Sequence, residues 1–237
     1  MLSSKSVWGP NSKLSHTHSR KRSRILFPQQ RSLSAITAAS SGGEPPRSPV
    51  GRGWRPRISS GVRKVLHGES VTLRAPVESD VAVLAAVRAK PEVRRWWRGG
   101  GDLAAEMARD LADPGSEALV IEHGGRTVGL IQWHAEEEPD YRHAGIDIFL
   151  DPSVRGRGLG PDAIGALARH LFDDHGHHRI TIDPAASNAA AIRCYEKVGF
   201  RPVGVMRQYE RGADGTWHDG LLMDLLAGEL VAPPSRA

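Results

Sequence analysis

The chain of 237 residues contains a single cysteine, Cys194. One cysteine excludes an internal disulfide framework and a cysteine-rich zinc site, and it fits a reducing compartment. No apolar run approaches the roughly 20 residues that a membrane-spanning helix needs, which excludes an integral membrane protein. No segment repeats at a fixed period, so a solenoid or propeller is excluded as well.

Acidic residues are nearly absent from the first part of the chain. Residues 1–64 hold 13 Lys and Arg against one acid, Glu44, whereas residues 65–237 carry a net charge of −7. The overall charge of +5 therefore does not indicate a basic nucleic-acid-binding domain. Because this Ser-, Arg- and Pro-rich segment has no helical or strand periodicity, we expect 1–64 to be a disordered leader. The alternatives for this segment are an organelle transit peptide and a contact site for RNA or an anionic membrane at Arg20–Arg24.

The rest of the chain alternates between strand-like and helix-like segments. Gly124-Gly125 separates two apolar runs and is the strongest hairpin signal. We predict one α+β domain over residues 65–230, built on a mixed central sheet flanked by helices, with 231–237 as a short tail. Strands are expected at 71–76, 118–123, 127–134, 143–150, 179–183, 203–210 and 217–226, and helices after Glu78–Asp80 and at 103–111, 161–175 and 188–197.

A glycine-rich loop connects the strand at 143–150 to the helix that follows. Its sequence is Arg155-Gly156-Arg157-Gly158-Leu159-Gly160. Glycines let the backbone fold closely around an anion, and the start of the helix offers N–H groups with a positive dipole end. No Gly-Lys-Ser/Thr follows, and the spacing does not fit a dinucleotide fingerprint, so neither of these nucleotide-binding motifs applies. A phosphate-binding loop and a plain glycine-rich turn remain.

The loop, read as R-x-x-G-x-G, resembles the pyrophosphate-binding loop of the GNAT superfamily of acyl-CoA-dependent N-acetyltransferases. Downstream, Asn188 is followed by Tyr195 and then by Gly199-Phe200, which resembles the closing helix of that superfamily. The resemblance implies the GNAT fold, with acetyl-CoA as cosubstrate. The residues that it implies for binding acetyl-CoA are Phe149, Leu150, Arg155, Gly156, Arg157, Gly158, Leu159, Gly160, Asn188 and Tyr195.

Within the superfamily, the chain is most similar to the aminoglycoside 6′-N-acetyltransferases, from about Val71 to Phe200. The motifs that carry this similarity are Trp96-Trp97, Gly145-Ile146-Asp147 and the block Asp183-Pro184 to Lys197. The tail beyond Phe200, with Asp214-Gly215-x-Trp217, departs from the family pattern.

The resemblance implies that Asp147 is the catalytic base and that Tyr195 protonates the leaving thiolate or donates a hydrogen bond to its sulfur. An amine of pKa ~10.4 costs about 4–5 kcal/mol to deprotonate at pH 7, so a carboxylate that accepts the proton is useful. Backbone N–H groups near Phe149 and Leu150 would bind the thioester carbonyl. For Asp147 a strand-edge charge or a salt bridge is the alternative.

Substrate binding is implied for Asp147 and Asp183, and for Trp96 and Trp97 by stacking on sugar rings; packing of the two tryptophans is the alternative. We expect a small polycationic amine as second substrate, a cytoplasmic location, no bound metal, no membrane or nucleic-acid partner, and a monomer or homodimer. Two other functions stay open: a siderophore-type lysine N-acyltransferase and a non-catalytic acyl-CoA-binding module.

Overall fold

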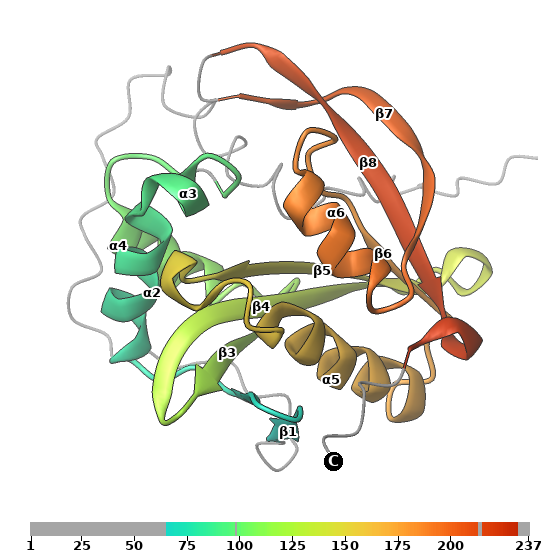
Figure 1. Ribbon diagram of the computed structural model, residues 1–237, viewed down its shortest axis with the longest axis horizontal. Coiled ribbons are helices and arrows are strands. Elements are labelled where there is room, and N and C mark those ends of the chain that lie inside the picture. The colour runs from blue at the N-terminus through green and yellow to red at the C-terminus, as the bar shows by residue number, and fades with distance from the viewer. Residues whose placement is uncertain (1–64, 98, 213–214, 232–237) are drawn as a thin grey trace, which may run out of the picture. The chain divides into compact units, whose positions relative to one another are not determined.

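A mixed sheet of eight strands runs through the part of the chain that the computed structural model describes, residues 65–97, 99–212 and 215–231 (Figure 1). The expected leader and residues 232–237 of the expected tail lie outside these ranges. The strand order is β1-β2-β3-β4-β5-β6-β8-β7, in which the β5–β6 pair is parallel and every other pair is antiparallel. The strands are β1 (Leu66–His67), β2 (Thr72–Arg74), β3 (Glu117–His123), β4 (Arg126–Glu136), β5 (His143–Leu150), β6 (Arg179–Ile182), β7 (Arg201–Arg211) and β8 (Trp217–Leu226).

Helices cover both faces of the sheet, which confirms the predicted α+β class with a mixed sheet. They are α2 (Asp80–Ala89), α3 (Pro91–Arg94), α4 (Leu103–Asp110), α5 (Leu159–Asp173) and α6 (Ala189–Glu196), with short 3-10 segments at Pro139–Tyr141, Pro152–Val154 and Ala227–Glu229. In this part of the chain, none of the helices is both apolar enough and long enough to cross a membrane.

The predicted elements are present with small shifts of their ends. The Gly124-Gly125 turn joins β3 to β4 with both glycines at positive φ, and β5 has the predicted bounds. Asn188 caps α6, since its side chain accepts a hydrogen bond from the N–H of Ala191. The short strand β1 and the one-turn helix α3 were not predicted; each is too short to give a periodic signal.

Two hydrophobic clusters lie on opposite faces of the sheet. On β3, Leu119 and Ile121 pack into the cluster that α5 and α6 complete, while Ala118 and Val120 pack into the cluster of α2 and α4. Because side chains alternate along a strand, a strand buried on both faces must be continuously apolar, as β3 is from Ala118 to Ile121. The buried stripe of α5 includes Ile164, Leu167 and Leu171, as predicted from helical spacing.

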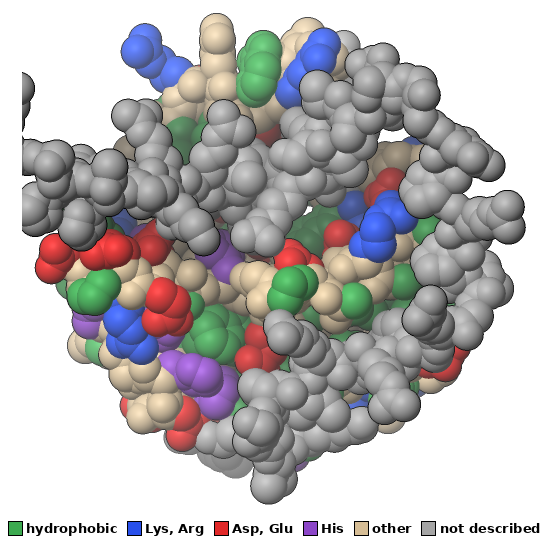
Figure 2. Space-filling model, turned by 180° about the vertical axis from the view of Figure 1, so that it is seen from behind, with side chains coloured by type: hydrophobic (Ala, Val, Ile, Leu, Met, Phe, Trp, Pro, Cys, Tyr) green, Lys and Arg blue, Asp and Glu red, His purple; other side chains and the backbone are tan. Residues whose placement is uncertain are grey.

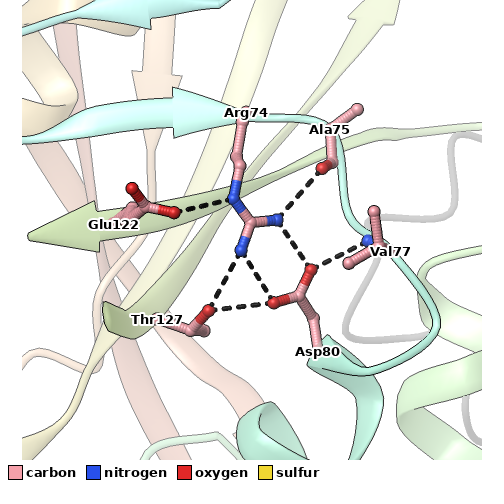
Figure 3. Close-up of polar contacts among 6 residues, drawn as sticks. All are labelled: Arg74, Ala75, Val77, Asp80, Glu122 and Thr127. Carbon is pink, nitrogen blue, oxygen red and sulfur yellow. Dashed lines mark hydrogen bonds and ion pairs between the residues drawn. The ribbon is translucent and has the colours of Figure 1, made fainter. Parts of the chain in front are cut away.

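A partly buried ion-pair network joins the start of α2 to β2 and β3 (Figure 3). Arg74 binds both carboxylate oxygens of Asp80, at 2.7 and 2.9 Å, and its Nε donates to Glu122 at 2.9 Å. Burial alone would raise the pKa of Asp80, but the hydrogen bonds from Arg74, the Val77 N–H and Thr127 hold it below its usual range. The side chain of Asp80 is 5% exposed, so removing Arg74 would leave a buried carboxylate without its main partner.

Asp162, in the first turn of α5, ties the start of the domain to this helix. Its carboxylate accepts three backbone N–H groups, from Glu69 and Ser70 at 2.7 Å and from Val71 at 3.1 Å. Gly68 is required for the approach, because a Cβ there would lie 2.4 Å from Oδ1 of Asp162. The segment between β1 and β2 is thereby fixed to the helix that follows the glycine-rich loop.

Candidate active site

The parallel strands β5 and β6 are paired over only two residues and then separate. The ladder between β5 and β6 consists of Ala144 opposite Ile180 and Gly145 opposite Thr181. From Ile146 to Leu150, β5 therefore continues without ladder partners in β6. Opening a sheet between parallel strands exposes backbone groups and side chains that would otherwise be covered, and such points are common ligand-binding positions.

Asp147 lies two residues beyond this separation, on the face of β5 that also carries Phe149. Its side chain is 8% exposed, and Gln132, directly opposite on β4, donates a hydrogen bond from Nε2 to its Oδ2 at 3.3 Å. Burial, together with the charge of Asp183, raises the pKa of Asp147 to about 7, and the Gln132 hydrogen bond partly opposes this. A carboxyl group with that pKa can accept a proton near neutral pH.

Asp183, the other predicted carboxylate, lies just after the end of β6. Burial is the main cause that raises its pKa to about 6; the charge of Glu210 adds to the effect, and a hydrogen bond from Tyr209 opposes it. Tyr209 and Glu210 lie on β7, and the hydroxyl of Tyr209 donates to Oδ2 of Asp183. Because the charge of Asp183 affects the proton affinity of Asp147, the two carboxyl groups lie close enough to act on one substrate.

Tyr195, on α6, is buried and lies within electrostatic range of Asp147 and Asp183. Burial raises the pKa of its hydroxyl, and electrostatic interactions with Cys194, Asp147 and Asp183 raise it further. The hydroxyl is therefore protonated at neutral pH and can donate a hydrogen bond or a proton. The Cys194 thiol, whose pKa burial raises to about 11, also stays protonated, as expected for a packing residue.

The glycine-rich loop forms the start of α5. Gly156 and Gly158 have φ values of +75° and +81°, and Gly158 is the N-cap residue of the helix. Among the described residues, no side chain caps this helix start, which leaves the positive end of its dipole available to an anion. A Cβ on Gly160 would lie 3.0 Å from Sγ of Cys194, so this glycine lets α5 begin close to α6.

The two arginines of the loop, Arg155 and Arg157, are exposed. Arg155 donates weak hydrogen bonds to the carbonyl oxygens of Glu92 and Leu150, at 3.3 and 3.4 Å, and so links the loop to α3 and β5. Positive charge beside a positive-φ glycine loop is the combination that suits a diphosphate.

The two tryptophans have different surroundings. Trp97 is half-buried, with its ring edge-on to that of Phe149 and 5.0 Å between centroids. Trp96 lies beneath the Arg95 guanidinium, 4.4 Å from its ring centroid. Trp97 thus packs against Phe149 and borders the face of β5 that carries Asp147.

The acidic segment 136–140 begins at the last residue of β4 and leads toward β5. Figure 2 shows red acidic and purple histidine side chains gathered on the left of the face seen from behind, where this connection lies. Glu137, Glu138 and Asp140 are exposed, as expected of a solvated turn.

The structure brings together Asp147, Asp183 and Tyr195, three of the predicted site residues, whereas Asn188 serves as a helix cap. The sequence reasoning missed Gln132 and Tyr209. Gln132 had a signal, since it is a polar residue between isoleucine and tryptophan in a buried strand. Tyr209 had none, because its contact with Asp183 depends on the pairing of distant strands.

Comparisons of the chain with family models, curated proteins and solved structures agree on one family. Residues 76–207 match the acetyltransferase (GNAT) domain. Aminoglycoside N(6′)-acetyltransferase type 1 from Klebsiella pneumoniae is 32% identical over 159 residues, covering 58% of this chain and 77% of that enzyme. The solved structure of AAC(6′)-Ib in complex with paromomycin and acetyl-CoA is 30% identical with a TM-score of 0.58, covering 71% of this chain and 100% of that one.

A further relative has a different name. Mycothiol acetyltransferase from Arthrobacter sp. (strain FB24) is 29% identical over 166 residues, covering 65% of this chain and 50% of that enzyme. The chain therefore spans about half the length of this relative. The family match nonetheless covers more than half of the chain, and the predicted fold and cosubstrate are confirmed. The chain belongs to the GNAT family of acetyl-CoA-dependent acetyltransferases.

Proposed function

We propose that this acetyltransferase acts on the 6′-amine of aminoglycosides and that Asp147 is its catalytic base. The observation that carries the proposal is the buried Asp147 carboxyl, whose pKa is about 7, beside the separation of β5 and β6. The similarity to an aminoglycoside N(6′)-acetyltransferase and to an acetyltransferase solved with paromomycin supports the substrate class.

A polycationic amine fits the charge of this site. Asp147, Asp183 and Glu210 lie within electrostatic range of one another, because the charge of Asp183 acts on Asp147 and that of Glu210 acts on Asp183. An ammonium group favours the ionised form of each carboxyl, so binding of the substrate lowers the pKa values that burial has raised. Substrate binding thus prepares Asp147 to accept a proton.

The reaction is a direct acyl transfer. Asp147 takes a proton from the ammonium group, and the free amine attacks the thioester carbonyl of acetyl-CoA. A C–N bond forms and the C–S bond breaks. The second proton that the nitrogen loses reaches the thiolate of CoA, either through Tyr195 or directly while Tyr195 donates a hydrogen bond to the sulfur. The products are the N-acetylated amine and free CoA.

We assign acetyl-CoA to the predicted loop residues. The glycine loop at Arg155–Gly160 would hold the diphosphate on backbone N–H groups at the start of α5. Backbone N–H groups near Phe149 and Leu150 would bind the thioester carbonyl, a contact worth about 3–4 kcal/mol in acyl transfer. They belong to the part of β5 that continues beyond its ladder with β6. Trp96 and Trp97 would border the bound sugar, and Asn188 fixes the start of α6, which carries Tyr195.

The test is a substrate panel with the full chain. Incubation with acetyl-CoA and kanamycin or tobramycin should release free CoA and give a product whose mass is increased by one acetyl group. Paromomycin, which carries a hydroxyl in place of the 6′-amine, is the matched control and should not be acetylated at that position. Absence of turnover across all 6′-amino compounds would contradict the proposed substrate.

The similarity to mycothiol acetyltransferases favours a second candidate, acetylation of the amine acceptor of those enzymes. The same panel with that acceptor separates the two. Lysine with a longer acyl-CoA tests the siderophore-type reaction, and acetyl-CoA binding without turnover on any amine would indicate a binding module. We place the activity in residues 65–230 and predict a cytoplasmic location.

A further inference from the structure

One of the three tyrosines of the chain, Tyr209, connects the edge strand β7 to the proposed active site. Tyr209 is half-buried on β7, and its hydroxyl donates a hydrogen bond to Oδ2 of Asp183. No step of the reaction described above uses Tyr209. Its contact with a substrate-binding carboxylate therefore needs its own explanation.

The backbone beside Tyr209 is in an unusual conformation. The register between β7 and β8 shifts between Met206 and Glu210, and Gln208 within this shift has a φ of +50°. It is the single non-glycine residue at positive φ in the described part of the chain. The Gln208 N–H donates to Oδ1 of Asp219 at 2.7 Å, which holds the irregularity in place. Strained residues of this kind persist where the surrounding structure fixes them, and they cluster at functional sites.

The ring of Tyr209 also has a dedicated place to pack. Gly220 on β8 is buried, and a Cβ there would lie 2.7 Å from Cδ1 of Tyr209 and 3.1 Å from Cε of Met206. Glycine is thus required at this position for the ring to approach the strand.

The same part of β8 holds the turn that follows Asp183. Gly220 forms an isolated bridge with Ala185, and the N–H of Leu221 donates to the carbonyl of Pro184 at 2.8 Å. In Figure 1, β8 lies between β6 and β7, as the strand order requires. One strand therefore fixes both partners of the Tyr209–Asp183 hydrogen bond.

The hydrogen bond affects the charge as well as the position of Asp183. Burial and Glu210 favour the neutral carboxyl, whereas donation by Tyr209 favours the carboxylate. Asp147 on β5, Glu210 on β7 and Tyr195 on α6 are the other titratable groups that interact with Asp183. Loss of the Tyr209 hydroxyl would leave Asp183 neutral over a wider range of pH.

We propose that Tyr209 is a positioning residue that holds the Asp183 carboxylate in one orientation to bind a second ammonium group of the substrate, while Asp147 serves the reacting amine. This inference rests on the proposed function in one respect, since it needs a substrate with more than one cationic group. Tyr209 then determines affinity for polycationic amines and leaves the chemical step unchanged.

The experiment compares Tyr209→Phe with the wild-type full chain. The variant keeps the ring on Gly220 and removes only the hydroxyl. Tyr141→Phe is the matched control, because that tyrosine is 73% exposed and lies on the connection between β4 and β5. At pH 7 we expect Tyr209→Phe to raise KM for the amine about tenfold, while kcat stays within about twofold. KM for acetyl-CoA should match that of the control.

A second measurement needs no amine substrate. The carboxyl carbon of Asp183, assigned with Asp183→Asn and followed by NMR during a pH titration, should titrate at higher pH in Tyr209→Phe than in the wild type. Gly220→Ala, which displaces the ring and keeps the hydroxyl, should show the same shift. An unchanged Asp183 titration in Tyr209→Phe, or an unchanged KM for an accepted polyamine, would overturn the proposal. Failure of the proposed substrate would appear instead as no turnover by the wild type, and the titration would still test Tyr209.

Discussion

Gln132 on β4 and Asp147 on β5 lie directly opposite each other on neighbouring strands, and the Gln132 amide donates a hydrogen bond to the buried Asp147 carboxyl at 3.3 Å. This hydrogen bond favours the carboxylate, while burial and the charge of Asp183 favour the protonated form. The balance gives Asp147 a pKa of about 7, so small changes in its surroundings alter its protonation at neutral pH.

The pH dependence of the rate follows from this balance. Asp147 must be ionised to accept a proton, so kcat/KM should fall about tenfold for each pH unit below about 7 and level off above it. In Gln132→Met the carboxylate loses its donor, the pKa of Asp147 rises, and the midpoint should move to higher pH. The pH–rate profiles of the two proteins measure this; a midpoint that is unchanged or moves to lower pH would contradict the role of Gln132.

Asp147 should also lower the stability of the protein. Its pKa in the folded state lies above the usual value of 3.8, so the folded state binds more protons between about pH 4 and 7, and stability falls as pH rises through that window. Above pH 7 the full penalty applies. Asp147→Asn should therefore raise the free energy of unfolding at pH 8 by about 2–4 kcal/mol, with little effect near pH 4. Urea unfolding at the two pH values checks this, and equal stability at pH 8 would contradict it.

The glycine loop offers a matched pair of substitutions. Gly158 and Gly124 both have positive φ and open space where a Cβ would be, so Gly→Ala at either position should cost about 1–2 kcal/mol of stability. Only Gly158→Ala should weaken acetyl-CoA binding, by about tenfold, because relief of the backbone strain displaces the N–H groups at the start of α5. Calorimetric titration with acetyl-CoA distinguishes the two variants, and equal affinities would argue against the assigned loop.

Asp162 provides a test of the fold. Asp162→Ala removes the acceptor of three backbone N–H groups and should lower the free energy of unfolding by about 2–3 kcal/mol. Asp173→Ala, at the exposed other end of α5, is the control and should change it by less than about 0.5 kcal/mol. Denaturant unfolding measures both, and equal losses would show that the Asp162 contacts do not hold the strand segment.

The sequence indicated those features of the fold and site that depend on local chemistry. The Gly124-Gly125 turn, the bounds of β5 and the Asn188 cap follow from conformational preference and periodicity. The Tyr209–Asp183 contact joins residues 26 positions apart through strand order and an irregular register, which no local pattern encodes.

Tertiary contacts also distinguish residues that look alike in the sequence. Two adjacent tryptophans read the same in sequence, yet Trp97 packs on Phe149 and Trp96 lies under Arg95. The Arg74–Asp80 pair was not predicted, because charges six residues apart on a strand and a helix meet only once the connection between them folds.

The central claim is that Asp147 receives the proton of the amine while acetyl-CoA is held independently at the start of α5. Asp147→Asn keeps the size of the side chain and an acceptor for Gln132 but cannot accept that proton. Acetyl transfer by this variant at neutral pH should fall by at least about a hundredfold, with the Kd of acetyl-CoA unchanged. Near-normal turnover, or a comparable loss of acetyl-CoA binding, would contradict the account.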